Sequence, residues 1–290
     1  SDCFKPAFNY RPKQSAQYAL AISNFEKSSE FPQRYNFGFI ASTDDHTARP
    51  GTGYKQYERR KMTFATGVKS KMWEYQYKAD DPNFPEIPKI TPGESQPDSE
   101  RVSSFVYPGG ILAVHAKGRG KDEIWTALKN KNVYGTSGPR ILLWFDLINS
   151  PEGTAPMGSE IIMSQNPKFI VRAAGSFKQK PGCSDESIDS LSPKRLEYLC
   201  AGECYNPSNE REIIDQIEVI KITPQKYAGE AISPLIQDPW RTIPCQGTGQ
   251  CIVEFEDQNF SRDSIYYVRA IQKALPAING APLSQRGGFE

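Results

Sequence analysis

The sequence predicts a first half of α/β type followed by a second half that is mostly β. Two observations carry this prediction. In residues 109–136 an apolar run, an amphipathic segment and another apolar run follow one another, which indicates the strand, helix and strand of a βαβ unit. After residue 140 short apolar runs alternate with turn residues, which is typical of an antiparallel sandwich-like domain. We therefore divide the chain into residues 1–139 and residues 140–290.

The first domain is predicted to begin with a helix over residues 13–27, because apolar residues recur there near helical spacing. The apolar run 37–41 predicts a short buried strand. Residues 50–108 are rich in Pro, Gly, Lys, Glu and Ser, and they predict a long excursion with one helix around residues 54–62. A loop of this size is typical of a lid, a partner-binding arm or a site of cleavage.

The βαβ unit is predicted to consist of a strand over residues 109–116, a helix over 122–129 and a strand over 133–136. Acidic residues in the first turn of this helix and Lys129 in its last turn suit the helix dipole. In the second domain only residues 191–199 are predicted to be helical. The predicted strands there are residues 141–148, 160–163, 169–174, 213–222, 251–255 and 265–271.

The composition indicates a folded protein and argues against two classes of function. The chain has 290 residues, of which 38% are hydrophobic and 24% charged, so it can bury a sizeable core. Its 35 Lys and Arg balance 34 Asp and Glu, and a net charge of +1 gives no global field to attract nucleic acid. No apolar stretch approaches the roughly 20 residues that span a bilayer, so we expect no membrane span.

Six cysteines, five of them in the second half, favour disulfides over a metal site. Their spacing matches no paired Cys-x-x-Cys ribbon, and no histidine lies near them. Cys245 and Cys251 flank a turn and are placed to bridge a hairpin, while Cys183, Cys200 and Cys204 offer a second local bond. Disulfides would place the protein in an oxidising compartment, a periplasm or the cell exterior. The alternative is a set of reduced, buried thiols in a cytosolic protein.

The segment 42–49 carries the chemistry that stands out most. Successive side chains of an extended segment point to opposite faces, so Asp44 and His46 are placed to share a metal site while Asp45 faces away. These two ligands are too few, because Zn²⁺ takes about three or four protein ligands. The alternative is that Asp44 caps a turn and His46 is a packed residue. Arg49 is a candidate for binding a substrate phosphate or carboxylate, or else forms a surface ion pair.

Two further residues are candidates near this site. His115 lies on the next strand of the βαβ unit and is a candidate for the same rim, although a supporting or merely packed histidine is the favoured interpretation. Arg140 follows Thr-Ser-Gly-Pro and is a candidate anion clamp. The favoured alternative for Arg140 is a structural turn at the domain junction, because Gly-Pro is primarily turn chemistry.

With these elements in place, the chain resembles the DUF3604 family, which is grouped with the polymerase-and-histidinol-phosphatase (PHP) superfamily of metal-dependent phosphoesterases. The ordered set of matches makes the resemblance more specific than the Asp-x-His pair alone. The matching segments are residues 38–46 with 49–51 behind them, 123–128, 133–141, 156–160, 202–205, 238–240 and 266–270.

The resemblance implies that residues 1–139 are the C-terminal segment of a distorted PHP-type β/α barrel, followed by the antiparallel β domain. It implies two or three divalent metal ions, Zn, Mn or Fe, poised over a small phosphorylated substrate, with Asp44 and His46 as ligands. The His-x-His pair that opens the superfamily's fold has no counterpart here. We therefore expect the rest of the barrel to come from a missing N-terminal half or a companion chain, and this chain alone to be inactive.

Two rival functions remain open from the sequence. The chain is either part of an exported, non-catalytic binding or structural module with a vestigial metal site, or part of a metal-dependent hydrolase of a non-phosphate bond. A fold fixes its metals better than its substrates, so the resemblance does not choose between phosphate and other bonds.

Overall fold

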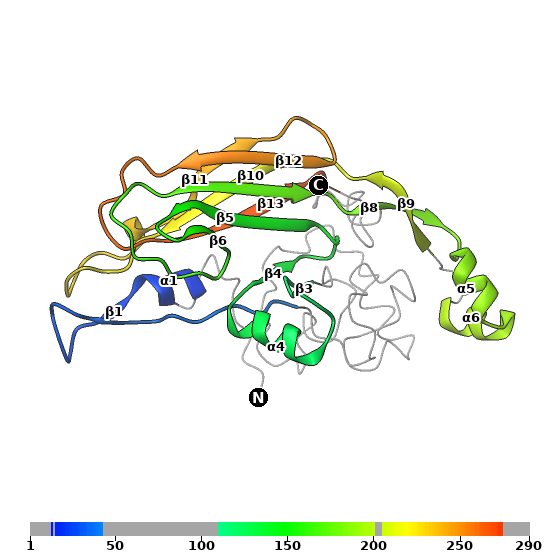
Figure 1. Ribbon diagram of the computed structural model, residues 1–290, viewed down its shortest axis with the longest axis horizontal. Helices are drawn as coiled ribbons and strands as arrows, with labels where there is room; N and C mark the ends of the chain where they lie inside the picture. Colours follow the sequence, from blue (N-terminus) through cyan, green and yellow to red (C-terminus); the bar gives the residue numbers. More distant parts are fainter. Residues whose placement is uncertain (1–12, 14, 43–109, 201–204, 275–290) are drawn as a thin grey trace, which may run out of the picture.

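The computed structural model describes residues 13, 15–42, 110–200 and 205–274, and this part of the chain is mostly β (Figure 1). Seven strands form two antiparallel sheets. One sheet has the order β12-β7-β5-β6, and the other has the order β11-β10-β13. Their bounds are Leu142–Ser150 (β5), Gly153–Pro156 (β6), Lys168–Ala174 (β7), Ile214–Ile222 (β10), Ile236–Pro244 (β11), Gln250–Glu256 (β12) and Ile265–Gln272 (β13). The antiparallel, sandwich-like second half predicted from the sequence is confirmed in this form.

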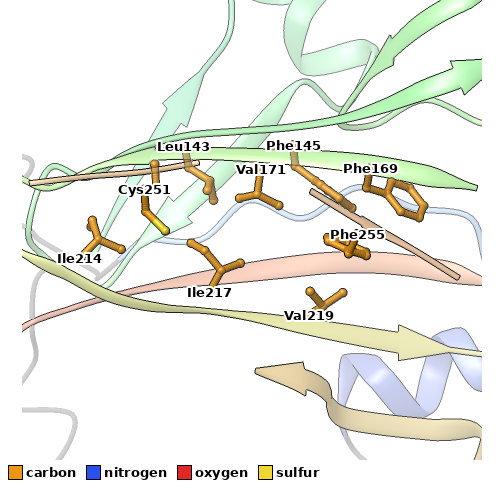
Figure 2. Packing of buried hydrophobic residues seen from close by; sticks show 10 residues of the cluster. Leu143, Phe145, Phe169, Val171, Ile214, Ile217, Val219, Cys251 and Phe255 are labelled. Atoms are coloured by element: carbon orange, nitrogen blue, oxygen red, sulfur yellow. The ribbon is translucent and has the colours of Figure 1, made fainter. Parts of the chain in front are cut away.

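The two sheets pack face to face around one apolar core (Figure 2). Alternate residues of β5, β7 and β12 point inward from one sheet, and they meet Ile217 and Val219 of β10. Ile217 and Val171 are fully buried, and burial of such a side chain stabilises the fold by about 1.5–3 kcal/mol. The rings of Phe145 and Phe169 lie 5.2 Å apart, so aromatic contacts fill the middle of the sandwich.

A short helix covers the outer face of the three-stranded sheet. Helix α1 spans Ala16–Ala21, with Ser15 as its N-cap, and buries Leu20 and Ala21 against β10. The predicted helix over 13–27 was too long, because tertiary contacts end it early. Ala21 O accepts from Gln225 N, and Ser23 N donates to the Gln225 side chain. The chain then forms strand β1 (Ser23–Asn24), which pairs with β2 (Gln33–Arg34).

The predicted strand–helix–strand order is present as β3 (Ile111–Val114), α4 (Lys121–Lys129) and β4 (Val133–Thr136). The two strands pair antiparallel, however, so the prediction of a parallel βαβ unit was wrong. The helix brings the chain back to the end of β3 from which it left, because His115 N donates to Asn132 O. Lys131 has a φ of 59° and closes the helix in a Schellman motif, with Asn132 N bonded to Ala127 O.

Residues 37–41 do not form the buried strand predicted for them. They belong to no sheet, and Phe37, Phe39 and Ile40 are 42%, 46% and 71% exposed. The segment still follows β4 in the same direction, since Gly38 lies against Lys131 and Ala41 lies against Gly135. Residues 160–163 also form no strand, and Ile162 is almost fully exposed.

A two-stranded arm projects from the sandwich (Figure 1). It consists of β8 (Phe177–Pro181) and β9 (Tyr205–Arg211), with α5 (Asp185–Ser190) and α6 (Pro193–Cys200) at its tip. Helix α6 matches the helix predicted over 191–199. The two strands of the arm were not predicted, because their polar sequence has no strand periodicity.

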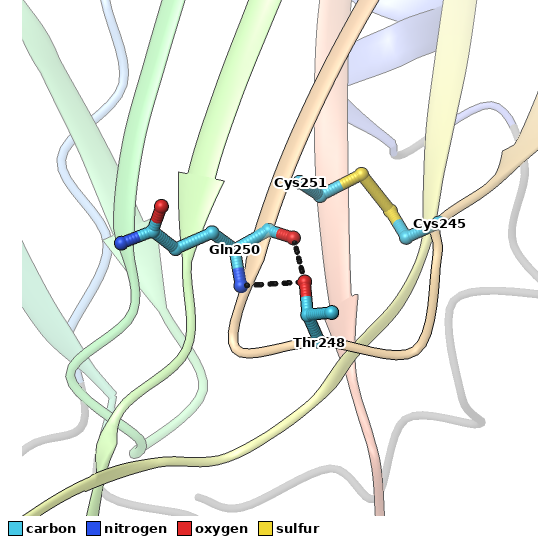
Figure 3. Close-up of a disulfide and its surroundings, with 4 residues drawn as sticks. All are labelled: Cys245, Thr248, Gln250 and Cys251. Atoms are coloured by element: carbon cyan, nitrogen blue, oxygen red, sulfur yellow. Dashed lines mark hydrogen bonds between the residues drawn. A yellow bond between two sulfur atoms is a disulfide. The ribbon is translucent and has the colours of Figure 1, made fainter.

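The predicted disulfide between Cys245 and Cys251 is present, with a Cα–Cα distance of 5.6 Å (Figure 3). Its role differs from the predicted hairpin bridge. Cys245 directly follows β11, and Cys251 lies in β12. These two strands belong to different sheets, so the bond ties the two layers of the sandwich together. Cys183 is also disulfide-bonded, and its partner lies outside the described side chains.

Candidate functional site

The predicted metal ligands Asp44 and His46 lie outside the described residues, as do Asp45, Arg49 and the excursion 50–108. The structure does show the approach to this motif, because the described chain reaches Ser42 beside β4. A Cβ on Gly135 would lie 2.6 Å from the Cβ of Ala41, so only glycine permits this close approach. The chain therefore enters the Asp-x-His motif next to the C-terminal end of β4.

The turn after β4 is held by the phenol of Tyr134. Tyr134 donates to Ile141 O at 3.0 Å and accepts from Leu143 N at 3.3 Å. Burial raises the pKa of Tyr134, which outweighs the opposing effect of the Leu143 amide, so the phenol keeps its proton near neutral pH. Ile141 N also donates to Pro139 O at 2.9 Å, which places Arg140 at the apex of a γ-turn.

Arg140 is exposed, and its guanidinium has no hydrogen-bond or ion-pair partner within the part of the chain that the structure describes. This placement agrees with the turn at the junction between β4 and β5. It also leaves the side chain open to an anion.

Strands β3 and β4 and helix α4 form a layer, the β3–α4–β4 layer, and His115 lies at the end of it opposite to Gly135. Because β3 and β4 are antiparallel, the C-terminal end of β3 lies beside Val133 and away from the Gly135 end of β4. The His115 Nε2 atom is 2.8 Å from Leu143 O, and a carbonyl can only accept, so Nε2 carries the proton. The ring also contacts Tyr134 and Trp144, with centroids 5.4 Å and 5.8 Å away. His115 thus connects the β3–β4 layer to the sandwich.

The segment 156–160 packs against the C-terminal end of α4. Gly158 has a φ of 90°, and a Cβ there would lie 2.4 Å from Asn130 O. Lys131 Nζ donates to Glu160 at 2.6 Å, and this bond lowers the pKa of Glu160. The segment therefore connects the C-terminal end of α4 to the chain that follows β6.

The sequence interpretation missed a buried ionic cluster inside the sandwich. Asp257 is 1% exposed, pairs with Lys221 and accepts from the Tyr266 phenol at 2.5 Å. Burial alone would raise the pKa of Asp257, but the bonds from Lys221 and Tyr266 outweigh it and lower the pKa. The cluster joins β10 to the turn after β12. The only sequence signal was Lys221 at an inward-facing position of β10.

A second cluster lies on the outer face of the three-stranded sheet. Arg269 binds Glu218 at 2.8 Å and also pairs with Asp238, while Gln17 of α1 donates to Asp238 at 2.6 Å. This cluster therefore anchors α1 beside the three-stranded sheet. Within the described ranges, no three His, Cys, Asp or Glu side chains come together in a way that suits a metal ion. None of the helices described there is long and apolar enough to cross a membrane.

Comparison with known families matches residues 25–180 to the model described as "Protein of unknown function (DUF3604)". The chain belongs to the DUF3604 family. The DUF3604 match includes the Asp-x-His motif, the β3–α4–β4 layer and the strands β5–β7, and it stops in β8. No curated protein and no solved structure matches the chain.

Proposed function

We propose that this DUF3604 chain is the C-terminal part of a PHP-type, metal-dependent hydrolase that acts on phosphate esters. The observation that carries the proposal is the Asp-x-His motif in a family member, entered from an extended segment that packs closely on Gly135. Asp44 and His46 would hold a divalent ion, Zn, Mn or Fe. Arg49 would bind the substrate phosphate.

The donor set suits such an ion, because carboxylate oxygen and neutral imidazole nitrogen both bind Zn²⁺, Mn²⁺ and Fe²⁺. A bound divalent ion would activate a water molecule and neutralise charge on the phosphoryl oxygens. Two ligands do not complete the coordination, so the proposal requires other ligands from the rest of the barrel. We do not propose His115 as one of them, because the antiparallel pairing places the C-terminal end of β3 away from the Gly135 end of β4.

Exposed apolar side chains support the presence of additional polypeptide. The rings of Tyr35, Phe37 and Phe39 form an edge-to-face row, with centroids 5.9 Å and 5.1 Å apart. On helix α4, Trp125 is 59% exposed. Contiguous apolar surface of this kind usually marks an interaction site. We propose that the remainder of the barrel covers the row, either as a preceding segment or as a companion chain.

Metal analysis and activity assays on the full-length protein test the proposal. We expect at least one bound transition metal per intact molecule and hydrolysis of phosphoester substrates. Asp44→Asn and His46→Gln should each lower activity by at least 100-fold and reduce metal content, while Asp45→Asn serves as the matched control and should do neither. Unchanged metal content and activity in both ligand variants would refute the proposal.

A non-catalytic, exported binding or structural module is the second candidate. The observation in its favour is the sandwich, which closes its own core and carries a disulfide between its sheets. The disulfide also supports our proposal of a periplasmic or extracellular location. Less than one metal ion per intact protein would favour the module. A substrate panel with lactones and amides beside phosphoesters separates the phosphoesterase from a hydrolase of other bonds.

A further inference from the structure

A second region with ligand-binding chemistry lies at the base of the arm, where β9 meets the disulfide loop. An open hollow of about 340 Å³ there is lined by Arg211, Thr248, Gly249 and Gln250. The hollow belongs to the sandwich, and none of the predicted metal or substrate residues takes part in it. It lies outside the segment matched by the family model.

Arg211 is held in place by two contacts that leave most of its donors unused. Its guanidinium carbon lies 4.0 Å from the centroid of the Phe177 ring, and Nη1 donates to Gly175 O at 2.7 Å. A guanidinium has five N–H donors in a rigid fork. No acid is paired with Arg211 among the described residues, and the nearby Glu210 pairs with Lys178 at 3.0 Å.

The opposite wall of the hollow is a loop that is fixed at several points. The Cys245–Cys251 disulfide closes it, Ile214 N donates to Thr248 O, and Gly175 N donates to Gly249 O. The Thr248 hydroxyl donates to Gln250 O at 2.7 Å. This rigid wall needs no ordering when a ligand binds, and preorganisation of this kind lowers the cost of binding.

Two features of the loop keep the hollow open and polar. A Cβ on Gly249 would lie 2.7 Å from the Cβ of Arg211, so the glycine allows the loop to approach the arginine without filling the space. The side-chain amide of Gln250 points away from the disulfide (Figure 3) and has no hydrogen-bond partner among the described residues. Because Gln250 and Arg211 both line the hollow, we assign this amide as a second donor to a bound ligand.

We propose that this hollow binds a small oxyanion, the carboxylate or phosphate group of a ligand, between the guanidinium of Arg211 and the amide of Gln250. The planar guanidinium can donate two parallel hydrogen bonds to two oxygens of such a group. Hydrogen bonds of this kind, between charged partners, are stronger than those between neutral groups. Among the residues that line the hollow only Arg211 carries a full positive charge, and Glu212 lies next to it in sequence. We therefore expect dissociation constants in the millimolar range, about 1 mM.

Titrations followed by NMR chemical shifts test the proposal on the complete chain at constant ionic strength. Inorganic phosphate and succinate are the two probes, with chloride as the ionic control. We expect saturable shifts of the amides of Thr248, Gly249 and Gln250 with at least one of the first two, and which probe binds tells phosphate from carboxylate. Chloride should give none.

Arg211→Gln should weaken binding at least tenfold. The matched control is Arg241→Gln, because Arg241 also stacks on an aromatic ring, Trp240 at 4.2 Å, but lies outside the hollow. The exposed Gln250→Ala change avoids the packing role of Arg211, and we expect it to weaken binding about fivefold with an unchanged melting temperature. Linear, non-saturating shifts, or equal affinities for all three variants, would overturn the proposal.

Discussion

The sandwich and the β3–α4–β4 layer differ in how completely they bury their apolar side chains. In the sandwich, two sheets bury each other's inward-facing side chains, and residues such as Ile214 and Ile217 are fully buried. In the layer, one short helix lies against two short strands, and only Ala127 of α4 is buried. The sandwich thus completes its own core, whereas the layer keeps apolar surface exposed. The difference indicates that stability resides in the sandwich and that the layer depends on its neighbours.

Removal of the buried carboxylate in the sandwich is expected to have the largest effect. Asp257→Asn leaves the Lys221 ammonium without its partner, and breaking a buried pair costs about 3–5 kcal/mol. Urea unfolding measures the loss. The double variant Asp257→Asn with Lys221→Met is the control and should recover part of the stability. A loss below about 1 kcal/mol would show that the cluster is solvated.

A matched pair of isoleucine truncations compares the two regions directly. Ile217→Ala opens a cavity in the sandwich core and should lower the free energy of unfolding by about 3 kcal/mol. Ile124→Ala, on the exposed face of α4, should change it by less than about 0.5 kcal/mol. Both are measured by urea unfolding. Equal costs would mean that the layer is as well packed as the sandwich.

The disulfide between the sheets should contribute less than the core. Replacing Cys245 and Cys251 together by alanine removes the constraint on a short loop, and the chain-entropy relation gives a loss of about 2 kcal/mol. Chemical denaturation of the oxidised wild type and the double variant measures this. Cys183→Ala, in the arm outside the sandwich, should cost less in the same assay. The reverse order would place the critical bond in the arm.

The smallest expected effect is a dependence on pH. Hydrogen bonds from Arg262 and from Lys226 N lower the pKa of Glu230 to about 2. The stability that this carboxylate adds is present above its ordinary pKa near 4.5 and is lost as the pH falls from there towards 2. Melting temperatures between pH 5 and about 2 should therefore fall less steeply in Glu230→Gln than in the wild type. Identical slopes would contradict the assignment.

The strands of the sandwich were largely predictable because their apolar residues alternate or cluster in short runs. Residues 213–222 became β10 and residues 265–271 became β13, within a residue or two. Strand β11 was missed, because the edge strand Ile236–Pro244 is polar and carries prolines. Edge strands bury little, so their sequences lack the pattern that identifies central strands.

The candidate site was less predictable, because its geometry depends on strand direction. His115 and the Gly135 end of β4 would share one rim if the strands were parallel, and the antiparallel pairing separates them. Asp44, His46 and Arg49 were chosen from residue type and spacing, and they lie outside the described residues. The hollow beside Arg211 could not be found from the sequence, since Arg211 and Gly249 lie far apart in it.

The amino-acid sequence alone was enough to locate most central strands of the sandwich, because buried strands contain short alternating or continuous apolar runs. It also determined α4 and the close spacing of Cys245 and Cys251. The three-dimensional arrangement was needed to show that β3 and β4 run antiparallel and that the disulfide joins two sheets instead of a hairpin. The physical reason is that local pattern records burial, which is the same for either strand direction, whereas pairing depends on contacts between segments distant in the chain.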